Sequence, residues 1–149
     1  MALSIVKGLL QHYVDSLVDE GVLNEQFSHI QTLRIEEPDF VEQLINTYCM
    51  NVEAVLSELT SCINLSHVDY SQLAVLARQV EDRSSGIGAE RVRLACGDLI
   101  QACDQMHTKN FSQALNWIKY EFALTRNKLQ AIAQMERRIV RLVTKQREQ

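Results

Sequence analysis

The fold class can be predicted most directly from the segment PDFVEQLINTYCMNVEAVLSELTSCI, residues 38–63. Its apolar side chains recur every three or four residues, a spacing that places them on one face of an α-helix. They are Val41, Leu44, Ile45, Tyr48, Val52, Leu56, Leu59 and Ile63. Acidic residues and Pro38 stand at the start, where a first helical turn favours both. We therefore predict one long amphipathic helix from Pro38 to about Ile63.

The same period runs through most of the remaining chain. Further helices are predicted over residues 3–20, 24–33, about 68 to 84–88, about 89–106, and from 110 for more than about 30 residues. Asn24, Ser66 with Asp69, and Asn110 with Gln113 have the spacing of N-caps. Five glycines, one proline and no sustained alternation leave little material for sheets. The prediction is an all-α fold, an antiparallel four-helix bundle with two additional N-terminal helices.

Length and cysteine usage bound the class of protein. A chain of 149 residues fits a single domain spanning 1–149, and its 46% hydrophobic content is ordinary for a globular protein. The cysteines form no C-x-x-C pair, so we interpret them as core side chains in a reducing compartment; they are Cys49, Cys62, Cys96 and Cys103. No leader-like segment and no span of about 18 apolar residues is evident. We expect a cytoplasmic protein that also reaches the nucleus by diffusion.

Motifs for enzyme chemistry are missing from the sequence. There is no Gly-rich phosphate loop, no H-E-x-x-H, no G-x-S-x-G, and no histidine or cysteine set at metal-ligand spacing. We therefore predict no enzymatic activity, no cofactor and no metal. Basic residues gather near the C-terminus, namely Arg137, Arg138, Arg141, Lys145 and Arg147. We attribute them to the end of the last helix, and because no aromatic residues alternate with them, neither nucleic acid nor a membrane is predicted as a partner.

Residues 76–89, LARQVEDRSSGIGA, carry the most informative motif. It resembles the signature of plant histidine-containing phosphotransfer proteins, in which a phosphoaccepting histidine is followed by Gln, then Lys and Gly, serines, and Ile or Val with Gly-Ala. The matching residues are Gln79, Ser84, Ser85, Ile87, Gly88 and Ala89, continued by Arg91, Val92 and Cys96. Further matches are Glu25-Gln26-Phe27, Pro38-Asp39-Phe40-Val41, Val68-Asp69, Asn127-Lys128-Leu129 and Met135-Glu136. The helical bundle predicted above agrees with the fold that this resemblance implies.

The departures from the signature concern its chemistry. In the same register, Arg78 stands at the histidine position, Glu81 at the lysine and Asp82 at the glycine. A phosphocarrier needs a neutral ring nitrogen near pH 7, whereas a guanidinium has no free lone pair. Two carboxylates in place of a lysine would also repel an arriving phosphoryl group. The resemblance therefore implies that this chain does not accept phosphate.

Helical phase predicts where these side chains point. A step of about 100° per residue places Arg78 and Asp82 opposite the apolar stripe, and leaves Val75 exposed beside them. The resemblance makes this face a candidate for docking a receiver domain; its residues are Val75, Gln79, Glu81 and Asp82. Arg78 would enter the acidic phosphoacceptor pocket of the receiver as a decoy cation. The sequence leaves open whether Glu81 and Asp82 hold Arg78 back instead.

The resemblance implies a pseudo-phosphotransfer protein. Such a protein binds the receiver domains of hybrid histidine kinases and response regulators, and competes with active carriers in a two-component relay such as cytokinin signalling. One alternative is a helical adaptor that has lost receiver binding, which the doubly acidic replacement would favour. Another is a phosphocarrier that uses a different histidine, although His67 and His107 are predicted to lie in loops.

Overall fold

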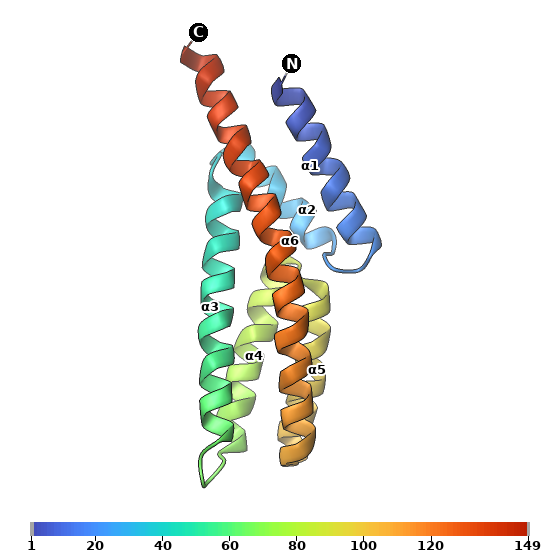
Figure 1. Ribbon diagram of the computed structural model, residues 1–149, viewed down its shortest axis with the longest axis vertical. Coiled ribbons are helices and arrows are strands. Elements are labelled where there is room, and N and C mark those ends of the chain that lie inside the picture. Colours follow the sequence, from blue (N-terminus) through green and yellow to red (C-terminus); the bar gives the residue numbers. More distant parts are fainter. Residues whose placement is uncertain (1, 149) are drawn as a thin grey trace.

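The computed structural model describes residues 2–148, which form six α-helices and one short 3-10 helix (Figure 1). They are α1 (Ala2–Asp19), α2 (Glu25–Thr32), η1 (Leu33–Ile35), α3 (Phe40–Ile63), α4 (Tyr70–Ile87), α5 (Glu90–Asp104) and α6 (Thr108–Glu148). No strand occurs within this range, so the all-α prediction is confirmed. Over the same residues, no helix combines the length and apolar character that crossing a membrane requires.

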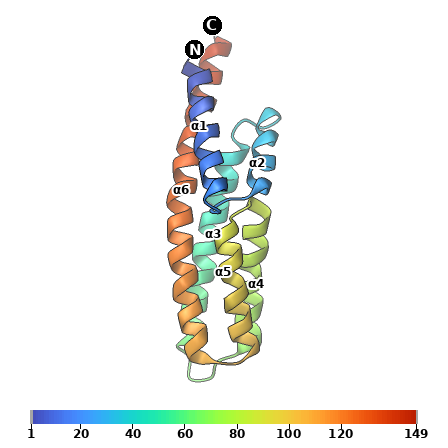
Figure 2. The same cartoon turned by 90° about the vertical axis from the view of Figure 1, so that its right-hand side faces the viewer.

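Four helices form the bundle, and the two N-terminal helices cover one end of it. Helices α3, α4, α5 and the first half of α6 lie side by side, each running opposite to its neighbours along the chain (Figures 1 and 2). The second half of α6 extends past the bundle and packs against α1, while α2 sits on the end of α4. This arrangement confirms the predicted antiparallel four-helix bundle with two additional helices.

The core is formed by the apolar stripes that the sequence shows. Within residues 38–63, Ile45, Val52 and Leu59 are completely buried. The largest fully buried side chains come from every long helix, from α2 and from the loop before it: Leu10, Leu17, Leu23, Phe27, Ile45, Leu59, Leu73, Ile87, Leu99, Phe111, Ile118 and Leu129. Cys49, Cys96 and Cys103 are free, buried thiols, as their interpretation as core side chains requires, and Cys62 is half-buried. Burial raises the pKa of the Cys96 thiol to about 12.

Two of the predicted helix caps are wrong. Asp69, not Ser66, caps α4, because its carboxylate accepts the Gln72 N–H at 3.2 Å. Helix α6 begins at Thr108 instead of residue 110, and His107 Nδ1 accepts the N–H of Asn110 at 3.2 Å. A histidine ring can accept this bond as well as an amide oxygen can, and no propensity rule ranks it among the usual caps.

Asn24 caps α2 as predicted, since its side-chain oxygen accepts the Gln26 N–H at 2.9 Å. Helix α3 begins at Phe40, two residues after the predicted start at Pro38. The predicted end of α4 near residues 84–88 agrees with the observed end at Ile87.

The Ile87-Gly88-Ala89 part of the motif forms the turn between α4 and α5. Gly88 adopts a left-handed conformation with φ of 82°, and the N–H groups of Gly88 and Ala89 both donate to the Ser84 carbonyl at 2.9 Å. The Gly88 carbonyl accepts the Asn24 N–H at 2.9 Å, which fixes the start of α2 against this turn. These motif residues are therefore explained by backbone geometry and by the docking of α2.

Gly88→Ala should lower the free energy of unfolding by about 2 kcal/mol, because a left-handed alanine is strained and has no room here. A Cβ at this position would lie 2.6 Å from the Phe27 backbone nitrogen and 2.7 Å from Asn24 Oδ1. Urea denaturation followed by circular dichroism measures the change. Gly86→Ala is the matched control, since a Cβ there meets nothing within 4 Å, and it should be neutral or stabilising by up to about 1 kcal/mol. Equal stability of the two variants would contradict this role of the turn.

Candidate functional site

The position singled out by the sequence, Arg78, lies on an open groove between α4 and the end of α5. The groove has a volume of about 470 Å³. Its lining residues are Tyr70, Ser71, Ala74, Val75, Arg78, Cys103, Asp104 and Met106. Val75 and Arg78 are both exposed, as the helical phase predicts. We call this feature the α4–α5 groove.

Apolar side chains form the rim of the α4–α5 groove. Val75 is 48% exposed and Met106 is 69% exposed, whereas Ala74 and Cys103 below them are buried. Met106 follows the end of α5 with a positive φ of 52°. The hydroxyl groups of Tyr70 and Thr108 are hydrogen-bonded at 2.5 Å, which joins the start of α4 to the start of α6. The groove is therefore built on ordered backbone and offers apolar contact area beside a cation.

Arg78 has no carboxylate partner in the part of the chain that the structure describes. The ion pairs found there involve Arg34, Arg93, Arg126 and Arg137. The Arg78 charge does reach Cys103, whose thiol pKa is raised to about 11 by burial and by Asp104, while Arg78 opposes the shift. Arg78 therefore lines the groove as an exposed cation that is available to an outside acceptor.

The two acidic neighbours of Arg78 behave differently from each other. Glu81 is half-buried, and its charge acts on α5, where it contributes to raising the pKa of Arg93 and of Cys96. The main cause of the Arg93 shift is its pairing with Glu90 at 2.5 Å. Asp82 is exposed on α4. Neither carboxylate forms an ion pair with Arg78 among residues 2–148.

The remaining predicted site residues fall into two groups. Gln79 and Ser85 are exposed on α4, and Gln79 shares its outer face with Val75 and Asp82. Ser84 is completely buried, and its hydroxyl is hydrogen-bonded to the Tyr48 hydroxyl at 2.8 Å. Burial raises the pKa of Tyr48 above its ordinary value. Ser84 is therefore a core contact between α3 and α4. The turn residues Ile87, Gly88 and Ala89 are also buried, so these four motif residues are not available to a partner.

Sequence reasoning missed much of the groove lining. Ser71 and Ala74 lie one turn before Val75 and Arg78, so the helical period could have placed them on this face. Asp104 and Met106 come from α5 and the loop after it. No local pattern signals their position, because only the packing of α5 against α4 brings them there.

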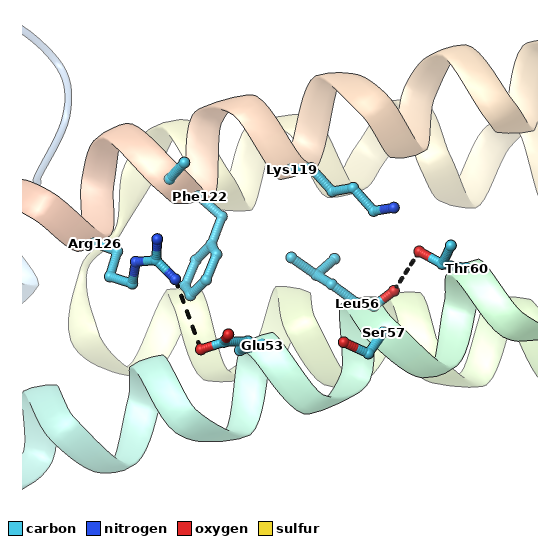
Figure 3. A pocket seen from close by; sticks show the side chains of 8 residues that line it. Glu53, Leu56, Ser57, Thr60, Lys119, Phe122 and Arg126 are labelled. Atoms are coloured by element: carbon cyan, nitrogen blue, oxygen red, sulfur yellow. Dashed lines mark hydrogen bonds and ion pairs between the residues drawn. The ribbon is translucent and has the colours of Figure 1, made fainter.

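A second hollow lies between α3 and α6 (Figure 3). Leu56 and Phe122 form its apolar floor, and Arg126 lies over the Phe122 ring with its guanidinium carbon 5.7 Å from the centroid. Arg126 is also 3.6 Å from a Glu53 oxygen, and the Thr60 hydroxyl donates to the Leu56 carbonyl at 2.9 Å. Glu53 and Arg126 are thus paired with each other across α3 and α6, and the Thr60 hydroxyl is bonded within α3, so this hollow is not our candidate site.

The fold is that of solved histidine-containing phosphotransfer proteins. The structure of such a protein from maize superposes with a TM-score of 0.83 at 26% identity and covers 90% of this chain and 99% of its own. One from Medicago truncatula matches the fold with a TM-score of 0.84 at 23% identity, over 92% of this chain and 94% of its own.

Sequence relatives identify the family. Histidine-containing phosphotransfer protein 1 of Arabidopsis thaliana is 33% identical over 132 residues, which is 88% of this chain and 86% of the relative. Pseudo histidine-containing phosphotransfer protein 6 of the same plant is 31% identical over 123 residues, 81% of this chain and 80% of the relative. No family model matches the chain. The relatives suffice to show that the chain belongs to the family of histidine-containing phosphotransfer proteins.

Proposed function

We propose that this protein is a pseudo-phosphotransfer protein, which binds receiver domains of a two-component relay and competes there with active carriers without accepting phosphate. The observation that carries the proposal is the unpaired, exposed Arg78 beside the α4–α5 groove. In the register of the family signature, this is the position of the phosphoaccepting histidine. Both kinds of relative, those named as phosphotransfer proteins and those named as pseudo forms, are similar to this chain.

The proposed lack of phosphate uptake follows from the chemistry of Arg78. Attack on an aspartyl phosphate needs a lone pair on the nucleophile, and a guanidinium with a pKa above about 12 offers none at neutral pH. Phosphate acceptance at this position is therefore excluded on chemical grounds. The protein would act through binding alone and would not be an enzyme.

Docking would place the Arg78 guanidinium in the acidic phosphoacceptor pocket of a receiver domain. Charge complementarity favours this contact, and the apolar rim of Val75 and Met106 supplies contact area around it. Glu81 is half-buried and its charge acts on Arg93 and Cys96 of α5, but it follows Arg78 by three residues and still opposes docking to an acidic pocket. Asp82 is the remaining exposed carboxylate on this face.

The two alternatives have less support. A carrier that uses another histidine would need an accessible ring beside the docking face, yet His67 lies in the loop before α4, and His107 caps α6 through Nδ1. His12 and His29 are exposed on α1 and α2, but neither lines the α4–α5 groove. A helical adaptor without receiver binding would have no need of an open groove around an unpaired arginine. We extend the proposal to a negative role in cytokinin-type signalling, in the cytoplasm and the nucleus, where a chain of this size diffuses.

Val75→Asp should weaken receiver binding at least about tenfold, because it places a carboxylate in the apolar rim and opposite an acidic pocket. Calorimetric titration against a panel of receiver domains measures this change, starting from an affinity of about micromolar. Ile5→Asp is the matched control, since Ile5 is 61% exposed on α1, away from the α4–α5 groove, and it should leave the affinity unchanged. Unchanged affinity of Val75→Asp would place the docking face elsewhere.

A further inference from the structure

A second groove lies between α5 and α6, at the edge of α5 that faces away from α4. It has a volume of about 340 Å³ and is lined by Arg91, Leu94, Ala95, Asp98, Trp117 and Glu121. Past Asp98 and Trp117 it continues into a polar hollow formed by the same two helices. None of its lining residues belongs to the α4–α5 groove. We call it the α5–α6 groove.

A buried carboxylate lies at the base of the α5–α6 groove. Glu121 is only 5% exposed, and its Oε2 atom has no hydrogen-bond partner among the residues that the structure describes. A buried carboxylate oxygen without a partner is unfavourable and favours the arrival of a cation or a donor. Arg91 lines the same groove, but its guanidinium donates to the Glu20 carbonyl at 3.0 Å and forms no ion pair with Glu121 or Asp98 within residues 2–148.

Exposed aromatic and apolar side chains flank this carboxylate. Trp117 is 51% exposed and Tyr120 is 59% exposed, and their ring centroids lie 6.2 Å apart. Leu94 across the groove is 58% exposed. Aromatic faces attract cations, tryptophan most strongly, and a half-exposed tryptophan is typical of a binding site. Asp98, which is exposed on the same rim, adds a second negative charge.

We propose that the α5–α6 groove binds an arginine side chain of a partner protein. The guanidinium would donate to Glu121 and Asp98 and stack on the Trp117 ring, and Leu94 would contact the aliphatic stem of the arginine. Arginine fits better than lysine, because its planar, weakly hydrated head group both stacks and donates in two directions. The chain's net charge of −4 adds long-range attraction for such a basic partner.

The sole tryptophan of the chain gives a direct readout of this groove. We expect the acetylated, amidated tripeptide Gly-Arg-Gly to change Trp117 fluorescence with half-saturation at about 1 mM, and added salt to weaken the effect. The same peptide with citrulline keeps the shape but not the charge, and it should bind at least about tenfold more weakly. The corresponding lysine peptide should bind with an affinity between those of the arginine and citrulline peptides. An equal response to the arginine and citrulline peptides would overturn the proposal.

Variants test which residues are responsible. Glu121→Gln should lower the affinity for the arginine peptide at least about tenfold, and Asp98→Asn, at an exposed position, should lower it about threefold. Circular dichroism checks that each variant is folded. Arg91→Met should strengthen binding, because it removes a competing cation from the groove. Glu58→Gln, an exposed change on α3, and Val75→Asp in the α4–α5 groove should have no effect. If both folded variants, Glu121→Gln and Asp98→Asn, bind the peptide as tightly as the unchanged protein, the groove does not recognise arginine.

Discussion

The triple variant Arg78→His, Glu81→Lys, Asp82→Gly should accept phosphate from a phosphorylated receiver at least about tenfold faster than Arg78→His alone. The histidine supplies a neutral ring nitrogen, since its ring has a pKa of about 6.5. By itself it remains in the field of two carboxylates, each of which opposes the phosphoryl group by about 2 kcal/mol at a separation of roughly 8 Å and an effective dielectric near 20. The two further changes remove this repulsion and add a balancing ammonium.

The structure permits all three changes. Position 78 is exposed on an open groove, so a histidine there is accessible to a partner. Glu81→Lys brings a cation toward Arg93, but Arg93 is already paired with Glu90 at 2.5 Å. Asp82→Gly alters an exposed position of α4 and should lower the free energy of unfolding by about 1 kcal/mol at most.

Radiolabel transfer followed over time gives the two rates. The label should be stable to base and labile to acid, as expected for phosphohistidine, and the unchanged protein should take up none. A folded triple variant that binds a receiver yet remains unlabelled would mean that the docking geometry differs from that of the carriers. The proposal of a relay competitor on a carrier-like surface would then have to be withdrawn.

Arg34→Met should lower the free energy of unfolding by about 3–5 kcal/mol at pH 7, a large part of the stability of a domain of this size. The Arg34 guanidinium forms an ion pair with Glu136, which is completely buried in α6. This pair fastens η1 to the long last helix. Without Arg34, the Glu136 carboxylate is left in the interior with no compensating charge.

The loss caused by Arg34→Met should depend on pH. Burial raises the pKa of Glu136 above its ordinary 4.5, and Arg34 opposes that shift, so the variant raises the pKa further. An acid with a raised folded-state pKa binds more protons in the folded state, so stability increases as pH falls through that pKa toward 4.5. Urea denaturation should therefore show a smaller loss at pH 5 than at pH 7.

Two controls separate the buried charge from the loss of packing. The double variant Arg34→Met, Glu136→Met removes both charges and should recover most of the lost stability. Arg137→Met breaks a pair near the surface, in which Nε of the exposed Arg137 lies 2.7 Å from an oxygen of the half-buried Glu42, and should change stability by about 1 kcal/mol at most. A double variant that is as unstable as Arg34→Met would show that packing, not charge, dominates at this position.

Most of the fold could be predicted, because apolar side chains recur along the sequence at helical spacing. The stripe from Val41 to Ile63 fixes which face of α3 is buried, and the other helices repeat the same logic. The helix caps at Asp69 and His107 could not be ranked from sequence, since several polar residues near each boundary compete for the same free N–H groups. The Arg34–Glu136 pair was equally hidden, because 102 positions separate its members.

In the candidate site, too, some features could be predicted from the sequence, whereas others depend on how the helices pack. The exposure of Val75 and Arg78 follows from helical phase, and the structure agrees. The influence of the Glu81 charge on Arg93 and Cys96 does not follow from phase alone, because both residues belong to a neighbouring helix. Met106 and Asp104 join the groove only through the packing of α5. The roles assigned to Arg78, Gln79 and Asp82 remain predictions from the family signature.

Incubation of the unchanged protein with a phosphorylated receiver domain, with binding and label measured on the same sample, shows whether the protein binds a receiver without taking up phosphate. We predict a complex of about micromolar affinity that contains the protein without any label on it. An active phosphotransfer protein in the same assay shows that the donor is competent, and adding the unchanged protein should slow its labelling. Base-stable, acid-labile label on any of its four histidines would contradict the account.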